Sequence, residues 1–447
     1  MKISFKTIFS ILIFIFLVSG CGSSGGDETP ASLEEVPEKV TEKNVEISEE
    51  TDQTLKGLYI SGIAIDGYIH NSQVSFLGKT VFTDENGNWK IDISDFEDQN
   101  LTNQIIIFSG GIDQTTGNDY EGVIQVPILD SEKSIIATPV TTIISTIVRD
   151  LNISAEESYE ILANAVNIPS KYLKIDHFEM IKNGTLEEKE LAIRIVKIIL
   201  IFQKNTEIIS ESLDSKNSAF MSISHSIGNM VQSRNDDNST FQEKIQDISS
   251  VIKNMDLDEM VKAKFLNSET AIKFMVSQID NIDEKQFENS EQDIDFLAKV
   301  ESQIKAIDMI AYQCEEIIQN SPENLESIKE SIENIWNMIA VLGGVSGLSL
   351  LAENSDLSSE ELSYKLFSTP AITTPLINIH TKLSDYNLTN TQISEVIIEV
   401  GQVDSTNMLQ ALDSVGDIIE NKIGEEFSDI SVILEMQKLQ AGLKDLI

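Results

Sequence analysis

Side chains that carry oxygen atoms alternate along one short polar stretch of the chain. Asp84, Asn86 and Asn88 occupy every second position, and a second polar stretch contains Asp113, Asn118, Asp119 and Glu121. Calcium takes about six to eight oxygen ligands from flexible loops, so these residue types indicate a calcium site at Asp84, Asn86 and Asn88. The stretch is no EF-hand, because Trp89 stands where that loop needs glycine. A plain hairpin turn explains the same residues, and we favour the turn.

The amino-terminal residues have the order of a secretory signal. Lys2 and Lys6 precede an apolar run over residues 8–18, and small residues follow it. A run of about eleven apolar residues is too short to cross a bilayer as a helix. A basic, then apolar, then small order is typical of a cleaved signal peptide. The sequence therefore predicts a signal peptide over residues 1–20.

The end of this segment, Val18-Ser19-Gly20-Cys21, resembles a lipobox, the cleavage site of bacterial lipoprotein precursors. The resemblance implies that the Cys21 thiol accepts diacylglycerol, that its freed amine is acylated, and that the mature chain begins there. Two or three acyl chains anchor a protein stably, since each buried methylene contributes about 0.8 kcal/mol. By the sorting rule of that family, Gly22 favours the outer membrane over the inner one, and the leaflet stays open. An ordinary signal peptide with an incidental Cys21 is the alternative.

Familiar catalytic and metal-binding motifs are missing from the sequence. It contains no H-E-x-x-H, no cysteine pair with zinc spacing and no Walker loop, and its G-x-S-x-G match lies in the glycine- and serine-rich residues 22–26 rather than in a strand-to-helix elbow. Cys314 has no cysteine partner in the mature chain, so we expect a small buried hydrophobe there. The four histidines are far apart in sequence: His70, His177, His225 and His380. We therefore assign no catalytic residue and expect no cofactor besides the calcium considered above.

The composition restricts the classes of partner. The net charge of the 447 residues is −41 at pH 7. Phosphate contacts need clustered Lys and Arg, so we expect no nucleic-acid partner. An acidic surface suits cations, basic partners or simple solubility. Apolar residues make up 41% of the chain, which is enough for a sizeable core.

The elements that would position these residues follow an acidic segment. Residues 21–56 are rich in acids and poor in aromatics, which predicts a lipidated tether and a disordered linker. Residues 57–130 show short alternating apolar runs separated by turn residues, typical of a small β-sandwich. The predicted strands cover residues 58–65, 73–77, 79–83, 88–93, 104–109 and 122–128. Asn86-Gly87 predicts a tight hairpin turn between the third and fourth of them.

Three motifs in this region resemble the bacterial carboxypeptidase-regulatory-like, or transthyretin-like, module. They are Gly62–Ile69, Ser72-Gln73-Val74 and Thr83–Trp89. They match an opening G-x-x-x-D-G strand, an x-V strand and a T-D-x-N-G-x-aromatic hairpin, and the resemblance covers residues 57–130. It implies an immunoglobulin-like sandwich that serves spacing, folding support or adhesion, without catalytic residues.

A junction and a helical region follow the predicted sandwich. Gly110–Asp113, Thr116-Gly117 and Ala137–Ile143 resemble junctions that join such sandwiches to helices in bacterial surface proteins. Apolar residues then recur at helical spacing, which predicts an irregular all-α domain over residues 131–447. Ser154 and Glu157 have the spacing of a helix cap. Further predicted helices cover residues 186–204, 220–231, 241–253, 259–279, 293–318, 323–342, 392–401, 405–422 and 428–446.

One apolar stretch raises the question of membrane insertion. Residues 334–352 carry no charge but contain Gly343, Gly344 and Gly347. We favour a buried helical hairpin broken at the glycines, and a second membrane span is the alternative.

These patterns predict an α+β multidomain protein, with a small immunoglobulin-like β-sandwich followed by a larger all-α helical domain. The expected function is that of a lipid-anchored cell-envelope protein, non-catalytic, which binds an envelope protein or surface ligand or organises the envelope. A periplasmic or surface hydrolase with its site in the helical domain is the alternative. It would need a cleft with convergent polar groups of perturbed pKa. A receptor that feeds a transporter would favour two hinged lobes, which the strand-then-helix order argues against.

Overall fold

The computed structural model describes residues 58–129, 134–210, 269–280, 296–320, 324–390, 417–424 and 430–443, with a few positions between them. The predicted signal peptide, Cys21 and the predicted linker over residues 21–56 lie outside the described residues. Nearly all of the helices predicted over residues 220–231 and 241–253 also lie outside them. The described residues form a β-sheet region over residues 59–137 and a mostly helical region after it, so the α+β class is confirmed.

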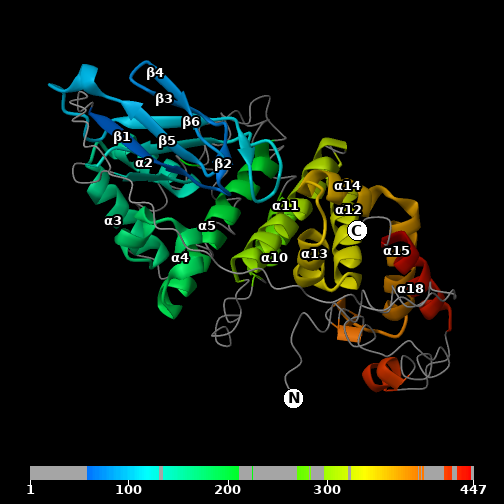
Figure 1. The fold of residues 1–447 in the computed structure, drawn as a ribbon. Coiled ribbons are helices and arrows are strands. Elements are labelled where there is room, and N and C mark those ends of the chain that lie inside the picture. Colours follow the sequence, from blue (N-terminus) through cyan, green and yellow to red (C-terminus); the bar gives the residue numbers. More distant parts are fainter. Residues whose placement is uncertain are drawn as a thin grey trace, which may run out of the picture.

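Short strands build the β region (Figure 1). They are β1 (Tyr59–Ala64), β2 (Ile69–His70), β3 (Gln73–Phe76), β4 (Lys79–Phe82), β5 (Asn88–Asp92), β6 (Ile105–Ser109), β7 (Ile112–Asp113), β8 (Val123–Pro127) and β9 (Ser134–Ala137). They pair in the orders β5-β1-β9, β2-β7 and β4-β3-β6-β8. The two larger sheets share one apolar core, which takes Ala64 and Ile91 from one sheet and Val74 from the other. Across it the rings of Trp89 and Phe108 lie 5.5 Å apart.

Each strand predicted from alternating apolar residues is present, but the predicted hairpin is wrong. Its turn exists, because Gly87 N donates to Asp84 O and Gly87 has a φ of 72°. However, β5 pairs with β1 while β4 pairs with β3, so the chain passes from one sheet to the other at this turn. The hairpin of the four-stranded sheet lies earlier, between β3 and β4, where Leu77 and Gly78 both have positive φ.

The β region extends past residue 130, where the sequence analysis ended it. β9 pairs in parallel with β1, with Ser61 opposite Ser134. Gly62 permits this close approach, because a Cβ there would lie 1.8 Å from the Ile135 carbonyl oxygen. Parallel pairing joins segments that are distant in sequence, so no local pattern reports it.

The helical region begins on the sheet itself. Thr138 caps α2 (Pro139–Leu151) in a reciprocal capping box with Thr141, and proline stands at the first helical position. The Thr142 hydroxyl accepts a 2.9 Å hydrogen bond from Gln125 N of β8, so α2 lies against the outer side of that strand. The two regions are therefore continuous at this junction.

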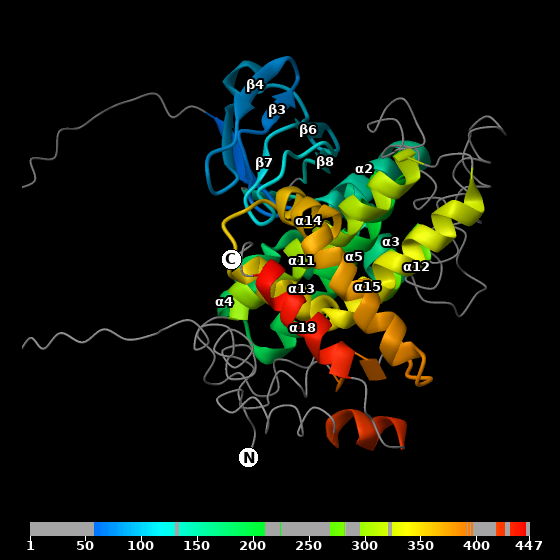
Figure 2. The ribbon, with the colours of Figure 1, turned by 90° about the vertical axis from the view of Figure 1, so that its right-hand side faces the viewer.

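The remaining helices extend away from the sheets (Figures 1 and 2). They are α3 (Ala155–Val166), α4 (His177–Asn183), α5 (Leu186–Ser210), α10 (Glu269–Asp280), α11 (Phe296–Asn320), α12 (Leu325–Val341), α13 (Gly344–Glu353), α14 (Ser359–Ser368), α15 (Pro370–Ser384) and α18 (Ile430–Leu443). The predicted cap at Ser154 is confirmed, since its side chain accepts from Glu157 N. Helix α11 is central and packs against α5, α10, α12, α13 and α14.

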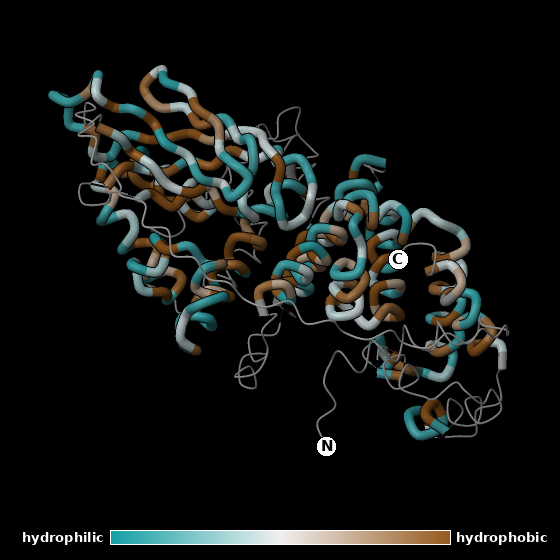
Figure 3. Tube along the Cα trace, viewed as in Figure 1, coloured by the Kyte–Doolittle hydropathy of each residue, from teal (hydrophilic) through white to brown (hydrophobic). Residues whose placement is uncertain are grey.

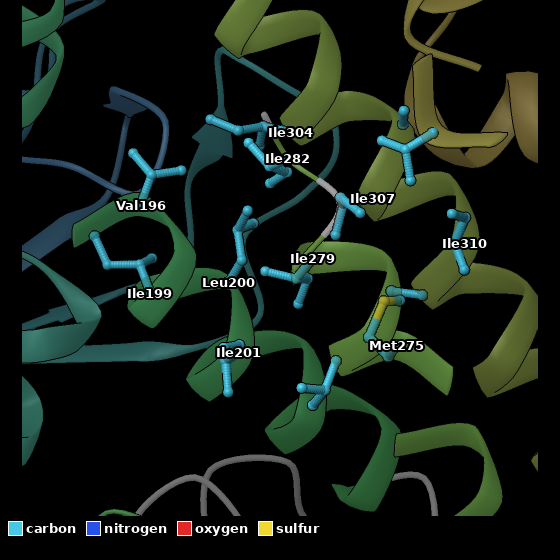
Figure 4. Close-up of a cluster of buried hydrophobic side chains, with 14 of the residues drawn as sticks. Val196, Ile199, Leu200, Ile201, Met275, Ile279, Ile282, Ile304, Ile307 and Ile310 are labelled. Atoms are coloured by element: carbon cyan, nitrogen blue, oxygen red, sulfur yellow. The ribbon is translucent and has the colours of Figure 1, made fainter. Parts of the chain in front are cut away.

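Helices α5, α10 and α11 meet in an aliphatic core (Figure 4). Leu200 of α5, Met275 and Ile279 of α10, and Ile307 of α11 are all buried there. Hydrophobic and hydrophilic residues alternate along most of these helices (Figure 3), and the buried ones are mainly aliphatic. Such burial of aliphatic side chains is the dominant stabilising contribution in a domain of this kind.

The uncharged stretch over residues 334–352 is a broken helix pair. α12 and α13 meet at 71°, and Gly343 between them has a φ of 90°. Within the part of the chain that the structure describes, no single helix is long and apolar enough to cross a membrane. The bent pair is long and apolar enough for a membrane span only when α12 and α13 are counted together.

Candidate functional site

An open hollow lies on the β region beside two of the predicted calcium ligands. Its volume is about 400 Å³, and it is lined by Ser61, Gly62, Ile63, Phe82, Asp84, Asn88, Trp89, Lys90 and Ser134. The outward row of the β5-β1-β9 sheet supplies three of these side chains, because Ser61 is paired with both Lys90 and Ser134. Strand alternation places such residues on the face opposite the core.

The Asp84 carboxylate at the rim of this hollow is engaged by its own turn. Oδ1 accepts from Asn86 N at 2.9 Å and from Asn88 N at 2.8 Å, and the Asn88 amide adds contacts at 3.2 Å. Slight burial acts to raise the pKa of Asp84, but these hydrogen bonds outweigh it and lower the pKa. Asn86 does not line the hollow. In the described residues, no group of three His, Cys, Asp or Glu side chains is placed to hold a metal ion.

The hollow combines aromatic and polar surface. Phe82 is 58% exposed, and the Lys90 ammonium lies 4.0 Å from the centre of the Tyr59 ring. Hydroxyl, amide, ammonium and aromatic groups together suit a polar ligand with a flat or apolar face. The sequence motif singled out Asp84 and Asn88 as calcium ligands, but it gave no sign of Lys90 or Phe82, which only the sheet arrangement brings beside them.

A second group of polar side chains lies where the β region meets the helices, buried except for the partly exposed Glu207, and we name it the joint. It consists of Asp66, Asp113, Lys204, Glu207 and Asp308. Lys204 Nζ lies 2.5 Å from Asp308 Oδ1 and 3.0 Å from Glu207 Oε2. These residues come from the turn after β1, from β7, from α5 and from α11.

Hydrogen bonds across the joint tie the β7 loop to two helices. Asn118 Nδ2 donates to Asp308 Oδ2 of α11 at 2.5 Å. At the start of α14, Ser359 N donates to Thr116 O at 3.0 Å, and Glu360 N donates to Asn118 Oδ1 at 3.4 Å. Asp113 and Asn118 of the second polar stretch therefore serve this contact.

The glycines of the motifs have a packing role at the joint. A Cβ on Gly67 would lie 1.8 Å from Asp113 Oδ1, and a Cβ on Gly111 would lie 2.6 Å from His70 O. Gly111 and Gly117 also have φ values of 105° and 78°, which favour glycine. The residues of the D-G, GG-x-D and TG motifs thus allow β7 and its loop to approach both the sheet and α14.

The buried charges of the joint shift one another's pKa values. Burial raises the pKa of Asp66 well above its usual range, and the nearby Asp113 carboxylate adds to the rise. Burial also raises the pKa of Asp113, although the Thr115 N–H opposes this. For Lys204, burial acts to lower the pKa, but Asp308 and Glu207 outweigh it and the pKa lies well above its usual range. Sequence analysis missed Lys204, although a lysine inside the apolar helix α5 is a signal of a buried partner.

Two contacts in the helical region have the residue types of a hydrolase nucleophile and base. Ser384 Oγ lies 3.5 Å from His380 Nε2, but the same nitrogen contacts Asn390 Oδ1 at 2.7 Å. Asn390 Nδ2 donates to Asn337 Oδ1, so Asn390 Oδ1 accepts from Nε2–H. A nitrogen that donates in this way cannot take the Ser384 proton.

The second contact joins α15 to α18. Lys382 Nζ lies 2.5 Å from Ser431 Oγ, and the charge of Lys382 contributes to a lowered pKa at Glu435, after the hydrogen bonds from Lys438 and Asn378. The pair joins two packed helices, so we interpret this contact as packing between helices. The remaining cysteine of the described residues, Cys314, is fully buried, and burial raises its thiol pKa far above the usual range, which suits the expected hydrophobic role.

Comparison with known proteins adds no relative, because no family model, curated protein or solved structure matches this chain.

Proposed function

We propose that this chain is a lipid-anchored envelope protein that binds a partner or surface ligand through its β region and performs no catalysis. Lipid on Cys21 would hold it to the outer membrane, as the lipobox-like sequence suggests. The β region would follow the immunoglobulin-like plan of the carboxypeptidase-regulatory-like modules. The observation that carries the binding role is the open hollow with its mixed aromatic and polar lining.

Asp66, Asp113 and Lys204, whose pKa values are shifted, are buried, which supports a binding function rather than a hydrolase activity. Asp66 and Asp113 are each 6% exposed, and Lys204 is 4% exposed. A substrate must reach its catalytic groups, so buried carboxyls that face one another serve packing rather than turnover. The hollow, by contrast, faces solvent and needs no conformational change to admit a ligand.

The anchor is tested by fatty-acid labelling of cells that produce the full chain. An alkyne analogue of palmitate should label the wild-type protein, and Cys21→Ala should remove both the label and the membrane fractionation. Cys314→Ala is the matched control, because it removes the second cysteine and should leave labelling intact. Labelling that survives Cys21→Ala would refute the anchor.

The binding role is tested with envelope fractions presented to the purified chain. Captured partners or glycans should bind wild type and lose about tenfold or more in affinity with Lys90→Glu or Phe82→Ala, since a charged or aromatic contact contributes about 1–2 kcal/mol. Lys182→Glu, an exposed position on α4, makes the same charge change away from the hollow and should bind normally. Equal affinity of all these variants would remove the hollow from the proposal.

A further inference from the structure

The charges of the joint do not balance. The group of five contains four carboxyl groups and one ammonium, that of Lys204. This ammonium pairs with Asp308 and Glu207. Asp113 Oδ1 accepts from Thr115 N at 2.7 Å. Asp66 Oδ2 is buried and has no hydrogen-bond partner among the described residues. An ionised carboxylate that is buried without donors is costly, and such groups neutralise by taking up a proton.

The groups that face Asp66 are mostly of like charge. Asp113 approaches from β7, Glu207 from α5 and Asp308 from α11, while the ammonium of Lys204 is the opposing charge. Tyr120 also faces this group, since the Asp66 charge is the first of those that act on its hydroxyl. The Tyr120 hydroxyl is buried and has no hydrogen-bond partner in the described part of the chain. The three carboxylates disfavour ionised Asp66, and only the ammonium of Lys204 opposes them within this group.

We propose that the Asp66 carboxyl carries a proton in the folded chain at neutral pH, and that loss of this proton loosens the joint between the β region and the helices. Ionised Asp66 would repel Asp113, whose carboxylate lies directly against Gly67. The contacts that weaken are those of the β7 loop with α11 and α14, namely Asn118 with Asp308 and Thr116 with Ser359. A rise in pH would therefore release the β7 loop from α11 and α14, while the shared apolar core keeps the two regions together.

The direction in which pH changes the stability of the joint follows from proton linkage. The folded chain holds a proton on Asp66 that the unfolded chain releases above its ordinary carboxyl pKa, near 3.8. The stabilisation by this proton is complete below that pH and is lost as pH rises through the folded pKa. Since one proton is involved, the opening equilibrium constant of the joint should rise by at most about tenfold per pH unit.

The test is amide hydrogen exchange of the full chain between about pH 5 and 9, corrected for the intrinsic rate. In the wild type, the amide of Ser359, which donates to Thr116 O, should lose protection as pH rises. Asp66→Asn, an isosteric mimic of the protonated carboxyl, should be better protected at high pH and show no such slope. The exposed Asp98→Asn is the matched control and should keep the wild-type slope. A flat wild type, or an Asp66→Asn variant with an unchanged slope, would overturn the proposal.

Two measurements keep the proposal testable if Asp66→Asn fails to fold. In wild type labelled with carbon-13 at aspartate carboxyls, at least one resonance should have the protonated shift at about pH 7; absence of such a resonance overturns the proposal. Exchange is also measured with added calcium chloride. If calcium restores protection at high pH in the wild type, a bound cation balances the charge in place of a proton, and the proposal is wrong.

Discussion

At the scale of single residues, the fold fixes the charge state of groups that the sequence leaves open. His177 is 1% exposed, and neither ring nitrogen has a hydrogen-bond partner within the described residues. Its ring lies 4.6 Å from the Phe178 ring. Burial lowers the pKa of His177 to about 4, against the opposing effect of the Asp176 carboxylate. At pH 6.5, where an exposed histidine is half protonated, the His177 side chain therefore stays neutral.

This burial predicts a specific loss of stability in acid. Between pH 6.5 and about 4, His177 binds a proton in the unfolded chain but stays neutral in the folded chain. The free energy of unfolding therefore falls by about 3 kcal/mol over this range. His177→Phe should remove this part of the acid sensitivity. Urea unfolding of both proteins at several pH values checks it, and a difference between them that is independent of pH would contradict it.

At the scale of elements, glycines set the turn between α12 and α13. Gly343 has a φ of 90° and Gly344 a φ of 70°. A Cβ on Gly347 would lie 1.6 Å from the Leu342 carbonyl oxygen, so α13 can begin only with glycine at that position. The glycines thus convert one uncharged stretch into two helices that pack on α11.

Gly347→Ala should therefore destabilise the chain, in contrast to a neutral change nearby. Accommodating the methyl requires the helices to shift, at a cost of about 1–3 kcal/mol in the free energy of unfolding. Ser346→Ala, one position earlier in α13, is the control and should change stability by less than about 0.5 kcal/mol. Thermal and urea unfolding measure the stability of both variants. Equal stability of Gly347→Ala and Ser346→Ala would show that the turn between α12 and α13 accommodates the added methyl group without cost.

At the scale of the whole molecule, the β region and the helices are linked at several separate points. Tyr68 Oη donates to Asp176 Oδ2 at 2.9 Å, and Ala155 N donates to Asn103 Oδ1 at 2.9 Å. The large apolar core itself begins with Ile65 of the β region and continues as far as Leu439 of α18. Together with the joint, these contacts favour unfolding of the two regions as one unit at neutral pH.

Lys204→Met should separate the two regions thermodynamically. Removing the ammonium takes the opposing charge from the Asp308 and Glu207 carboxylates, and breaking a buried pair from one side costs about 3–5 kcal/mol. Calorimetry should show one transition for the wild type and a lower or divided transition for the variant. Lys182→Met, an exposed change of the same type, should resemble the wild type, and a Lys204→Met variant with unchanged melting would show that the pair is not required.

The sequence by itself determined those features that depend on neighbouring residues. Alternating apolar residues located β1, a continuous apolar run located β6, and the spacing of Ser154 and Glu157 located the start of α3. The Asn86-Gly87 turn was also correct as a turn. Each of these depends on backbone preferences or hydrogen bonds within a few residues, which a sequence pattern reports directly.

Only the tertiary structure decided which segments meet. β5 pairs with β1 instead of forming the expected hairpin with β4. β9 lies beyond the expected end of the β region at residue 130 and pairs in parallel with β1. Lys204 pairs with Asp308, and the charges of both act on Asp66 and Asp113, which belong to the D-G and GG-x-D motifs. Long-range pairing and burial depend on the sum of many contacts distant in sequence, and the low dielectric that shifts these pKa values exists only once those contacts have formed.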